Sequence, residues 1–76
     1  MRITHDPDVN AAYIYFVDHI PPAGAAQTVP GDGLAAGINL DFDVDGRLLG
    51  LEVLDATLRL LEGFLDLIDS PRQLSD

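Results

Sequence analysis

The sequence contains no cysteine, which excludes disulfides, thiolate metal sites and thiol nucleophiles. Its two histidines, His5 and His19, cannot by themselves supply a zinc site of the usual type. A chain of 76 residues buries only about 60–65% of the surface that its unfolded form exposes. Because so thin a core benefits from a further stabiliser, we expect oligomerisation, with a metal site made of carboxylates alone as the minor alternative.

Lysine is also absent, and basic residues are few. The sequence contains thirteen aspartates and glutamates and four arginines, so the formal net charge is −9. The arginines are Arg2, Arg47, Arg59 and Arg72. Nucleic acids and anionic membranes both bind clustered positive charge, and we expect neither as a direct partner. A small basic protein is the natural complement of such a surface; the alternative is that the charge only keeps the domain soluble.

Long apolar runs are missing as well. No stretch approaches the ~18 residues needed to span a bilayer, and residues 1–6 lack the apolar region of a signal peptide. The expected location is therefore the cytoplasm. We predict a single domain over residues 1–70, with an irregular proline-containing segment at 18–32 and a frayed tail at 71–76.

Three segments of the N-terminal half have the composition of β-strands: residues 1–5, 11–17 and 27–29. Alternation along the second segment places Ile14 and Phe16 on one face, which we expect in the core, and Tyr13 and Tyr15 on the other. The tyrosine hydroxyls would then lie in water. Because exposed tyrosine is favoured at interfaces, Tyr13 and Tyr15 are candidate interface residues; ordinary sheet packing is the alternative.

Residues 38–54 form the clearest element, a β-hairpin around a turn at 43–46. Apolar side chains recur at every second position on both sides of the turn: Ile38, Leu40, Phe42, Leu49, Leu51 and Val53. Pairing Phe42 with Arg47 places Leu40 beside Leu49 and puts the apolar set on one face, as a half-buried hairpin requires. Gly46 supplies the positive φ that such a turn needs.

The same hairpin matches the calcium-loop pattern D-x-D-x-D-G-x5-E from Asp41 to Glu52. An EF-hand needs a helix on each side of the loop, whereas both flanks here alternate as strands. A strand rising ~3.3 Å per residue also carries Glu52 about 20 Å from the turn, too far to complete a site with Asp43 and Asp45. We predict a carboxylate-rich turn and no metal site; weak cation binding by these two aspartates is the alternative.

After residue 54 the apolar residues recur with the period of a helix, whose start Asp55 or Thr57 can cap. The fold class predicted is α+β: a small antiparallel β-meander of four or five short strands followed by one C-terminal α-helix. One apolar stripe of the helix can cover the sheet, and a second is a candidate homodimer interface. The first consists of Leu58, Leu61, Leu65 and Ile68, and the second of Leu60, Phe64 and Leu67. Gly63 is expected to bend or divide the helix.

Catalytic chemistry has little support in the sequence. His5 beside Asp6 could begin an acid–base pair, but no serine is suitably placed as a nucleophile, and Asp55 is explained more simply as a helix cap. We expect no catalytic residue and no cofactor. The alternative is a small enzyme or ligand-binding protein that uses His5, Asp6, Glu52 and Asp55 around one pocket.

Two segments resemble a known family. Asp6-Pro7 followed by residues 11–16 (AAYIYF) resembles the opening of the domain of unknown function 2283 family of small bacterial proteins, and residues 37–56 (GINLDFDVDGRLLGLEVLDA) resemble its signature. The resemblance implies a compact antiparallel sheet but no activity, because the family has none established. Its members are similar in setting to small antitoxin-like proteins, sometimes encoded beside small basic toxin-like proteins. The proline-rich middle loop and the apolar C-terminal segment depart from the family pattern.

The functional hypothesis from the sequence is therefore a non-enzymatic protein-interaction module. We expect its sheet and C-terminal helix to form a homodimer. The acidic surface would then remain free to bind a small basic protein.

Overall fold

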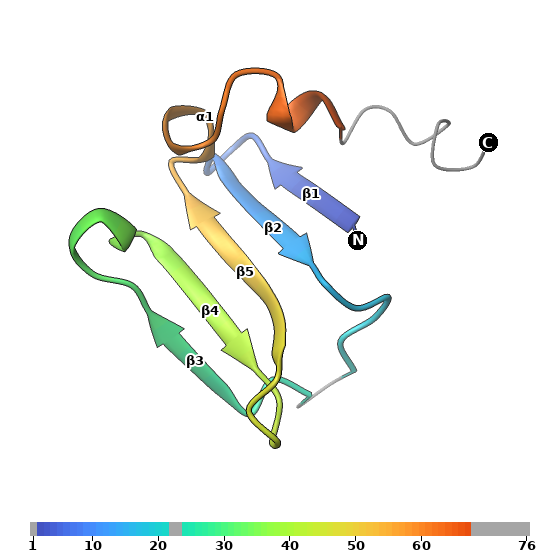
Figure 1. The fold of residues 1–76 in the computed structure, drawn as a ribbon. Coiled ribbons are helices and arrows are strands. Elements are labelled where there is room, and N and C mark those ends of the chain that lie inside the picture. Colours follow the sequence, from blue (N-terminus) through green and yellow to red (C-terminus); the bar gives the residue numbers. More distant parts are fainter. Residues whose placement is uncertain (1, 22–23, 68–76) are drawn as a thin grey trace.

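The predicted sheet is present in the computed structural model, which describes residues 2–21 and 24–67 (Figure 1). The elements of this part of the chain are β1 (Arg2–Asp6), β2 (Ala11–Tyr15), β3 (Gln27–Pro30), the 3-10 helix η1 (Gly33–Ala35), β4 (Ile38–Phe42), β5 (Leu48–Leu54), α1 (Ala56–Arg59) and the 3-10 helix η2 (Phe64–Leu67). All neighbouring strands pair antiparallel. The predicted fold class, a small antiparallel sheet followed by a C-terminal helix, is confirmed.

The strands lie in the order β1-β2-β5-β4-β3. β3, β4 and β5 follow one another as a meander, and the β1–β2 hairpin joins them because β2 pairs with β5. The connection at residues 16–26 carries the chain from β2 to the far edge of the sheet (Figure 1). The molecule extends over 33 × 32 × 19 Å, which is the flat shape of one layer of strands.

The central hairpin, β4–β5, has a different register from the predicted one. Leu40 lies opposite Leu51, not opposite Leu49, and a bulge interrupts the register at the turn end of β4. The turn is also wider than predicted, because the Asp43 amide donates to the Arg47 carbonyl at 2.8 Å. Since the shift is two residues, the core-facing side chains of the hairpin keep their predicted face.

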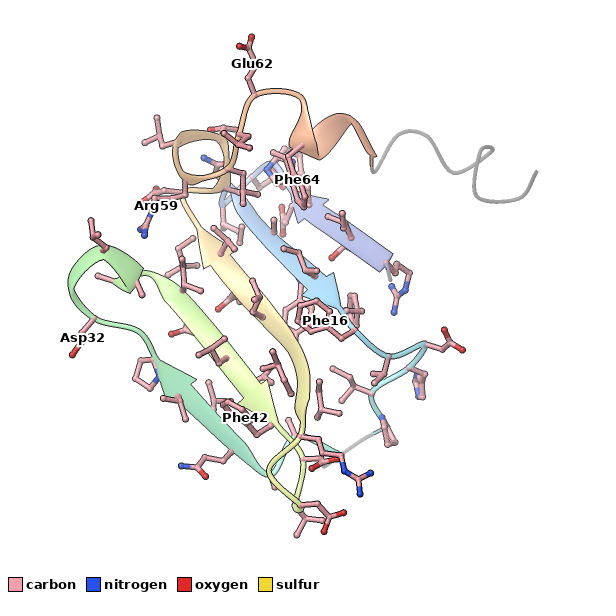
Figure 2. The ribbon with its side chains drawn as sticks, viewed as in Figure 1. Phe16, Asp32, Phe42, Arg59, Glu62 and Phe64 are labelled. Atoms are coloured by element: carbon pink, nitrogen blue, oxygen red, sulfur yellow. The ribbon has the colours of Figure 1, made fainter. Side chains whose placement is uncertain are left out.

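The core is small and lies toward one end of the sheet. Its buried residues in the described chain are Ala12, Ile14, Val53 and Ala56. Half-buried residues of the sheet and the C-terminal segment pack against them: Ile3, Ile38, Leu51, Leu60, Phe64 and Leu65. Phe16, which alternation assigned to the core, is 45% exposed, because it lies away from the end of the sheet where the C-terminal segment places Phe64 (Figure 2).

The C-terminal segment forms two short turns in place of one continuous helix. α1 ends where Leu60 becomes extended (φ −94°, ψ 152°), and Gly63 adopts φ 87° before η2 begins. The segment is divided, as predicted, but α1 already ends at Arg59, and Gly63 lies in the link before η2. Glycine suits this position because a side chain is strained at a positive φ. None of the helices within residues 2–21 and 24–67 has the length and hydropathy of a membrane-spanning segment. The predicted domain limit at residue 70 and the tail at 71–76 lie outside the described residues.

Candidate functional site

The face of the sheet opposite the core carries a row of polar and aromatic side chains running from β1 to β3. The Tyr13 hydroxyl donates to Asp41 Oδ2 at 2.5 Å, and Thr28 Oγ1 donates to Asp41 Oδ1 at 2.5 Å. Toward β1, the Tyr15 ring lies 4.5 Å from the Tyr13 ring, and Arg2 Cζ lies 3.8 Å from the Tyr15 ring centroid. We call these five residues the polar row.

Gly50 on β5 makes room for the polar row. A Cβ atom at this position would lie 2.6 Å from Tyr13 Cε1 and 2.6 Å from the carbonyl oxygen of Ile14. The Tyr13 ring therefore passes over the glycine backbone and reaches Asp41, which lies two strands away from β2. The expectation that both tyrosine hydroxyls lie in water is wrong for Tyr13, because its hydroxyl donates a hydrogen bond to Asp41.

The same environment sets the protonation of Tyr13. Burial raises the pKa of its phenol above the ordinary value of 10.0, and the hydrogen bond and negative charge of Asp41 raise it further. The phenol therefore remains a hydrogen-bond donor at neutral pH. Because Thr28 occupies the other oxygen of Asp41, this part of the row is a closed donor–acceptor network.

An open hollow borders the polar row. It has a volume of about 310 Å³ and is lined by Thr4, His5, Asp6, Val9, Ala11, Ala12, Tyr13 and Glu52. Three of the four residues considered for a carboxylate-based site, His5, Asp6 and Glu52, thus line one hollow, whereas Asp55 does not. Glu52 Oε1 accepts a hydrogen bond from Asn39 Nδ2 at 3.0 Å, so one of its carboxylate oxygens already has a partner.

Asn10 organises the corner where β2 begins and β5 ends. Its Oδ1 lies 3.0 Å from His5 Nε2, its Nδ2 donates to Thr57 Oγ1 at 2.9 Å, and its carbonyl accepts the amide of Ala56. Asp55 occupies the N-cap position of α1 with φ 54° but makes no side-chain capping bond. The predicted cap by Asp55 is therefore wrong, because Asn10 supplies the contacts at this end of α1.

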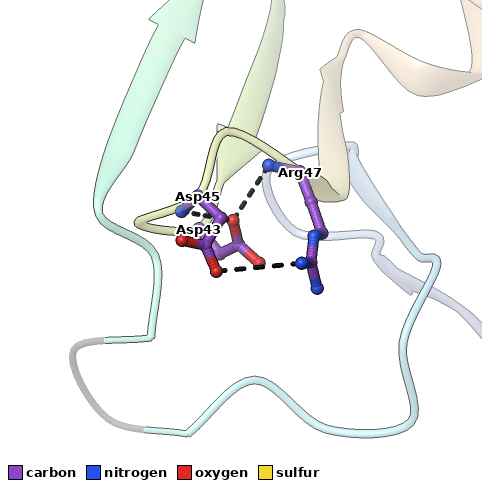
Figure 3. A network of polar contacts seen from close by, with 3 residues as sticks. All are labelled: Asp43, Asp45 and Arg47. Atoms are coloured by element: carbon purple, nitrogen blue, oxygen red, sulfur yellow. Dashed lines mark hydrogen bonds and ion pairs between the residues drawn. The ribbon is translucent and has the colours of Figure 1, made fainter.

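The turn that matches the calcium loop is closed by its own hydrogen bonds (Figure 3). Asp43 Oδ1 accepts the backbone amides of Asp45 at 2.8 Å and of Arg47 at 2.9 Å, and the Arg47 guanidinium lies 4.0 Å from the Asp45 carboxylate. Both flanks are strands, as predicted, and Glu52 lies on β5 beside Asn39. Within residues 2–21 and 24–67, no group of three or more histidine, aspartate or glutamate side chains could hold a metal ion.

The candidate interface residues lie in different environments. The two tyrosines belong to the polar row, whereas Leu60 and Phe64 are half-buried against the core. The side chain of Leu67 lies outside the described part of the chain. Exposed apolar side chains on the C-terminal segment are Leu58 (82%) and Leu61 (85%). Both residues belong to the stripe that was expected to cover the sheet, and at these two positions the stripe is exposed to solvent. Leu65 of the same stripe packs against the core.

Sequence reasoning did not identify Asp41, Thr28 or Gly50 as parts of a common site. Alternation shows that Asp41 and Gly50 point away from the core. Their contact with Tyr13 depends on the pairing of β2 with β5 and of β5 with β4, and the pairing of β3 with β4 adds Thr28. Local periodicity contains no signal for these long-range pairings.

These features define a class of protein: a small α+β domain with a single antiparallel sheet, a thin core on one face and a hydrogen-bonded polar row on the other. The chain belongs to the family described as Protein of unknown function (DUF2283), whose family model matches residues 2–56. The match covers all five strands and ends at the start of α1, and it confirms the resemblance seen in the sequence. No curated protein and no solved structure matches the chain.

Proposed function

We propose that this chain is a non-enzymatic protein-interaction module that self-associates and presents an acidic surface to a small basic protein, in the manner of an antitoxin. The observation that carries the proposal is the size of the core. Among the described residues only four hydrophobic side chains are buried, and Val53 is the largest that is fully buried. A single sheet with so little buried area benefits from a second surface to pack against.

Apolar side chains remain exposed around this core. Those on the described surface are Val9, Phe16, Val29, Leu34, Val44, Leu48, Leu54, Leu58 and Leu61. Individual exposed apolar residues are ordinary in soluble proteins. In a chain that lacks disulfides, association is the available means of removing more of this surface from water. Self-association is therefore the first part of the proposed function.

The distribution of charge supports the second part, a basic partner. Each arginine of the described chain has a contact within the chain: Arg2 stacks on Tyr15, Arg47 lies beside Asp45, and Arg59 donates to the carbonyls of Leu34 and Ala36. No charged side chain of the described residues is buried. The chain has a net charge of −9, and the carboxylates of its described residues therefore reach the surface, where they attract a positively charged protein.

Two measurements test the proposal. Light scattering after size-exclusion chromatography is expected to give a dimer at micromolar concentration, and a clean monomer contradicts self-association. Co-purification with a short basic protein encoded beside this chain is expected to give a complex that weakens as salt screens the charges. Absence of binding to such a protein at low salt contradicts the antitoxin-like role.

The hollow beside the polar row favours a second candidate function, the binding of a small cationic ligand. Asp6 and Glu52 supply negative charge there, and His5 and Thr4 supply further polar groups. An NMR titration with a small primary amine tests this function. Binding predicts shifts confined to the lining residues, and unchanged spectra at millimolar amine contradict it.

A further inference from the structure

The backbone hydrogen bonds determine which groups the edge strand β1 offers outward. The Phe16 amide, which directly follows β2, donates to the Leu49 carbonyl at 2.9 Å. Because backbone groups alternate in direction along a strand, the even-numbered residues of β2 bond to β5 and the odd-numbered residues bond to β1. The latter lie opposite Arg2, Thr4 and Asp6. The N–H and C=O groups of the intervening β1 residues therefore point away from the sheet.

Ile3 and His5 are these intervening residues, and each presents a complete donor and acceptor at the edge. No strand of the described chain pairs with this side of β1. Such an edge is a template for pairing with another strand. β1 also lacks proline, since Pro7 lies in the turn that follows it.

The opposite edge, β3, is protected. The Gly31 amide donates to the Ile38 carbonyl at 2.7 Å, so by the same alternation Thr28 and Pro30 are the residues directed outward. Proline has no N–H group and is found on edges that do not pair. Of the two edges, β1 is the one able to continue the ladder.

The sequence of β1 is complementary to itself when two copies run antiparallel. With Thr4 opposite Thr4 of the second copy, Ile3 lies opposite His5, and Arg2 lies opposite Asp6. The Ile3–His5 positions carry the outward backbone groups, so these pairs form N–H···O=C hydrogen bonds in both directions. The Arg2–Asp6 positions place opposite charges next to each other on the face of the polar row, which is a favourable cross-strand pair.

We propose that two copies of this chain pair through β1 about a two-fold axis at Thr4 and form one continuous antiparallel sheet. This inference rests on the self-association proposed above and names its surface. Such a dimer is isologous, so one favourable contact occurs twice. The Arg2 guanidinium, already stacked on Tyr15, gains a carboxylate from the second copy. On the other face, Ile3 of each copy lies opposite His5 of the second copy.

Charge reversal at the proposed dimer interface tests the pairing. Arg2→Asp places two carboxylates opposite each other, and Asp6→Arg places two guanidinium groups opposite each other. Each variant alone is expected to raise the dimer Kd about tenfold or more. An equimolar mixture of the two is expected to dimerise again, because both cross-strand pairs of the heterodimer are then opposite in sign. Sedimentation velocity measures these equilibria, and circular dichroism verifies folding.

Arg47→Asp is the matched control, because it makes the same change in net charge in the distant β4–β5 turn. Its Kd is expected to stay within about twofold of wild type, since Arg47 makes only an exposed ion pair. A wild-type dimer that responds to neither reversal overturns pairing through β1 and leaves self-association through another surface standing. A wild-type monomer at micromolar concentration overturns both proposals.

Hydrogen exchange on the wild-type protein tests the same contact without any substitution. The amides of Ile3 and His5 are expected to be protected at high protein concentration and to lose protection on dilution, because they bond only across the dimer. Fast exchange of both amides in a sample that sediments as a dimer overturns the β1 pairing, whatever the variants do.

Discussion

The ring of Tyr13 occupies the space that a side chain at position 50 would need, so the polar row depends on Gly50. An added Cβ would approach Tyr13 Cε1 and the Ile14 carbonyl oxygen to 2.6 Å. We expect Gly50→Ala to lower the free energy of unfolding by about 1–3 kcal/mol, the usual range for overpacking. Urea denaturation measures this change.

Gly33→Ala is the control for this substitution. Gly33 has φ 61° but no atom within 4 Å of an added Cβ, so only backbone strain of about 1 kcal/mol is expected. A loss at position 50 no larger than the loss at position 33 would show that an added Cβ fits beside Tyr13 and the Ile14 carbonyl without overpacking.

The hydrogen bond from Tyr13 to Asp41 is expected to stabilise the fold. Tyr13→Phe leaves the carboxylate with one donor fewer, and we expect a loss of about 1–2 kcal/mol, since bonds to charged groups exceed the ordinary value. Tyr15→Phe is the matched control, because no hydrogen bond of the Tyr15 hydroxyl is found among the described residues. Similar losses in both variants would contradict the special role of Tyr13.

The raised pKa of Tyr13 predicts a loss of stability at alkaline pH. The folded phenol holds its proton above 10.0, the ordinary value at which the unfolded phenol releases it. Between the unfolded and folded pKa values the unfolded state binds fewer protons, so stability falls as pH rises. This contribution is complete below pH 10.0 and disappears as pH passes through the folded pKa. Urea titrations of wild type and Tyr13→Phe at several pH values should converge above pH 10.0; a constant difference would contradict the prediction.

Asn10 and Asp55 both have φ 54°, but only the Asn10 side chain bridges the corner to His5 and Thr57. Asn10→Gly keeps the backbone relaxed and removes the hydrogen bonds, so we expect a loss of about 1–2 kcal/mol. Asp55→Gly removes no capping bond and relieves a left-handed residue, so stability should be unchanged or higher by up to about 1 kcal/mol. Thermal melts compare the pair. Loss of stability in Asp55→Gly equal to that in Asn10→Gly would contradict this assignment.

Leu60 and Leu58 lie two residues apart and are expected to respond differently to truncation. Leu60 is half-buried and packs against the core, so Leu60→Ala should cost about 2 kcal/mol or more. Leu58 is 82% exposed, and Leu58→Ala should change stability by no more than about 0.5 kcal/mol. Chemical denaturation of dilute samples, where association is weakest, measures both. A larger loss at Leu58 would show that its side chain is covered in solution.

Much of the fold was predictable from the sequence because the necessary signals are local. Alternation around residues 38–54 located both strands of the central hairpin, and Gly63 indicated that the C-terminal segment is divided, although α1 already ends at Arg59. The register was predicted two residues away from the observed pairing of Leu40 with Leu51. A two-residue shift preserves side-chain faces, so the hydrophobic pattern cannot distinguish the two registers; the bulge and the wide turn at Asp43 decide between them.

The candidate site was less predictable because it joins distant segments. Tyr13 stood out by residue type and face, but nothing near it in the chain indicated Asp41 as its acceptor. The exposure of Phe16 was also not predictable from the sequence. Alternation assigns a residue to one face of the sheet, but it does not show how much of that face the C-terminal segment covers.

The amino-acid sequence by itself determined the strand pattern, the acidic character, the exclusion of cysteine chemistry and the family, because these depend on composition and on periodicity within short segments. Only the tertiary structure decided that Tyr13 crosses Gly50 to reach Asp41, that Asn10 in place of Asp55 holds the start of α1, and that β1 is an open edge while Pro30 protects the other. The physical reason is that strand order and register place backbone and side-chain groups from distant segments together, and these long-range pairings are not encoded in any one segment.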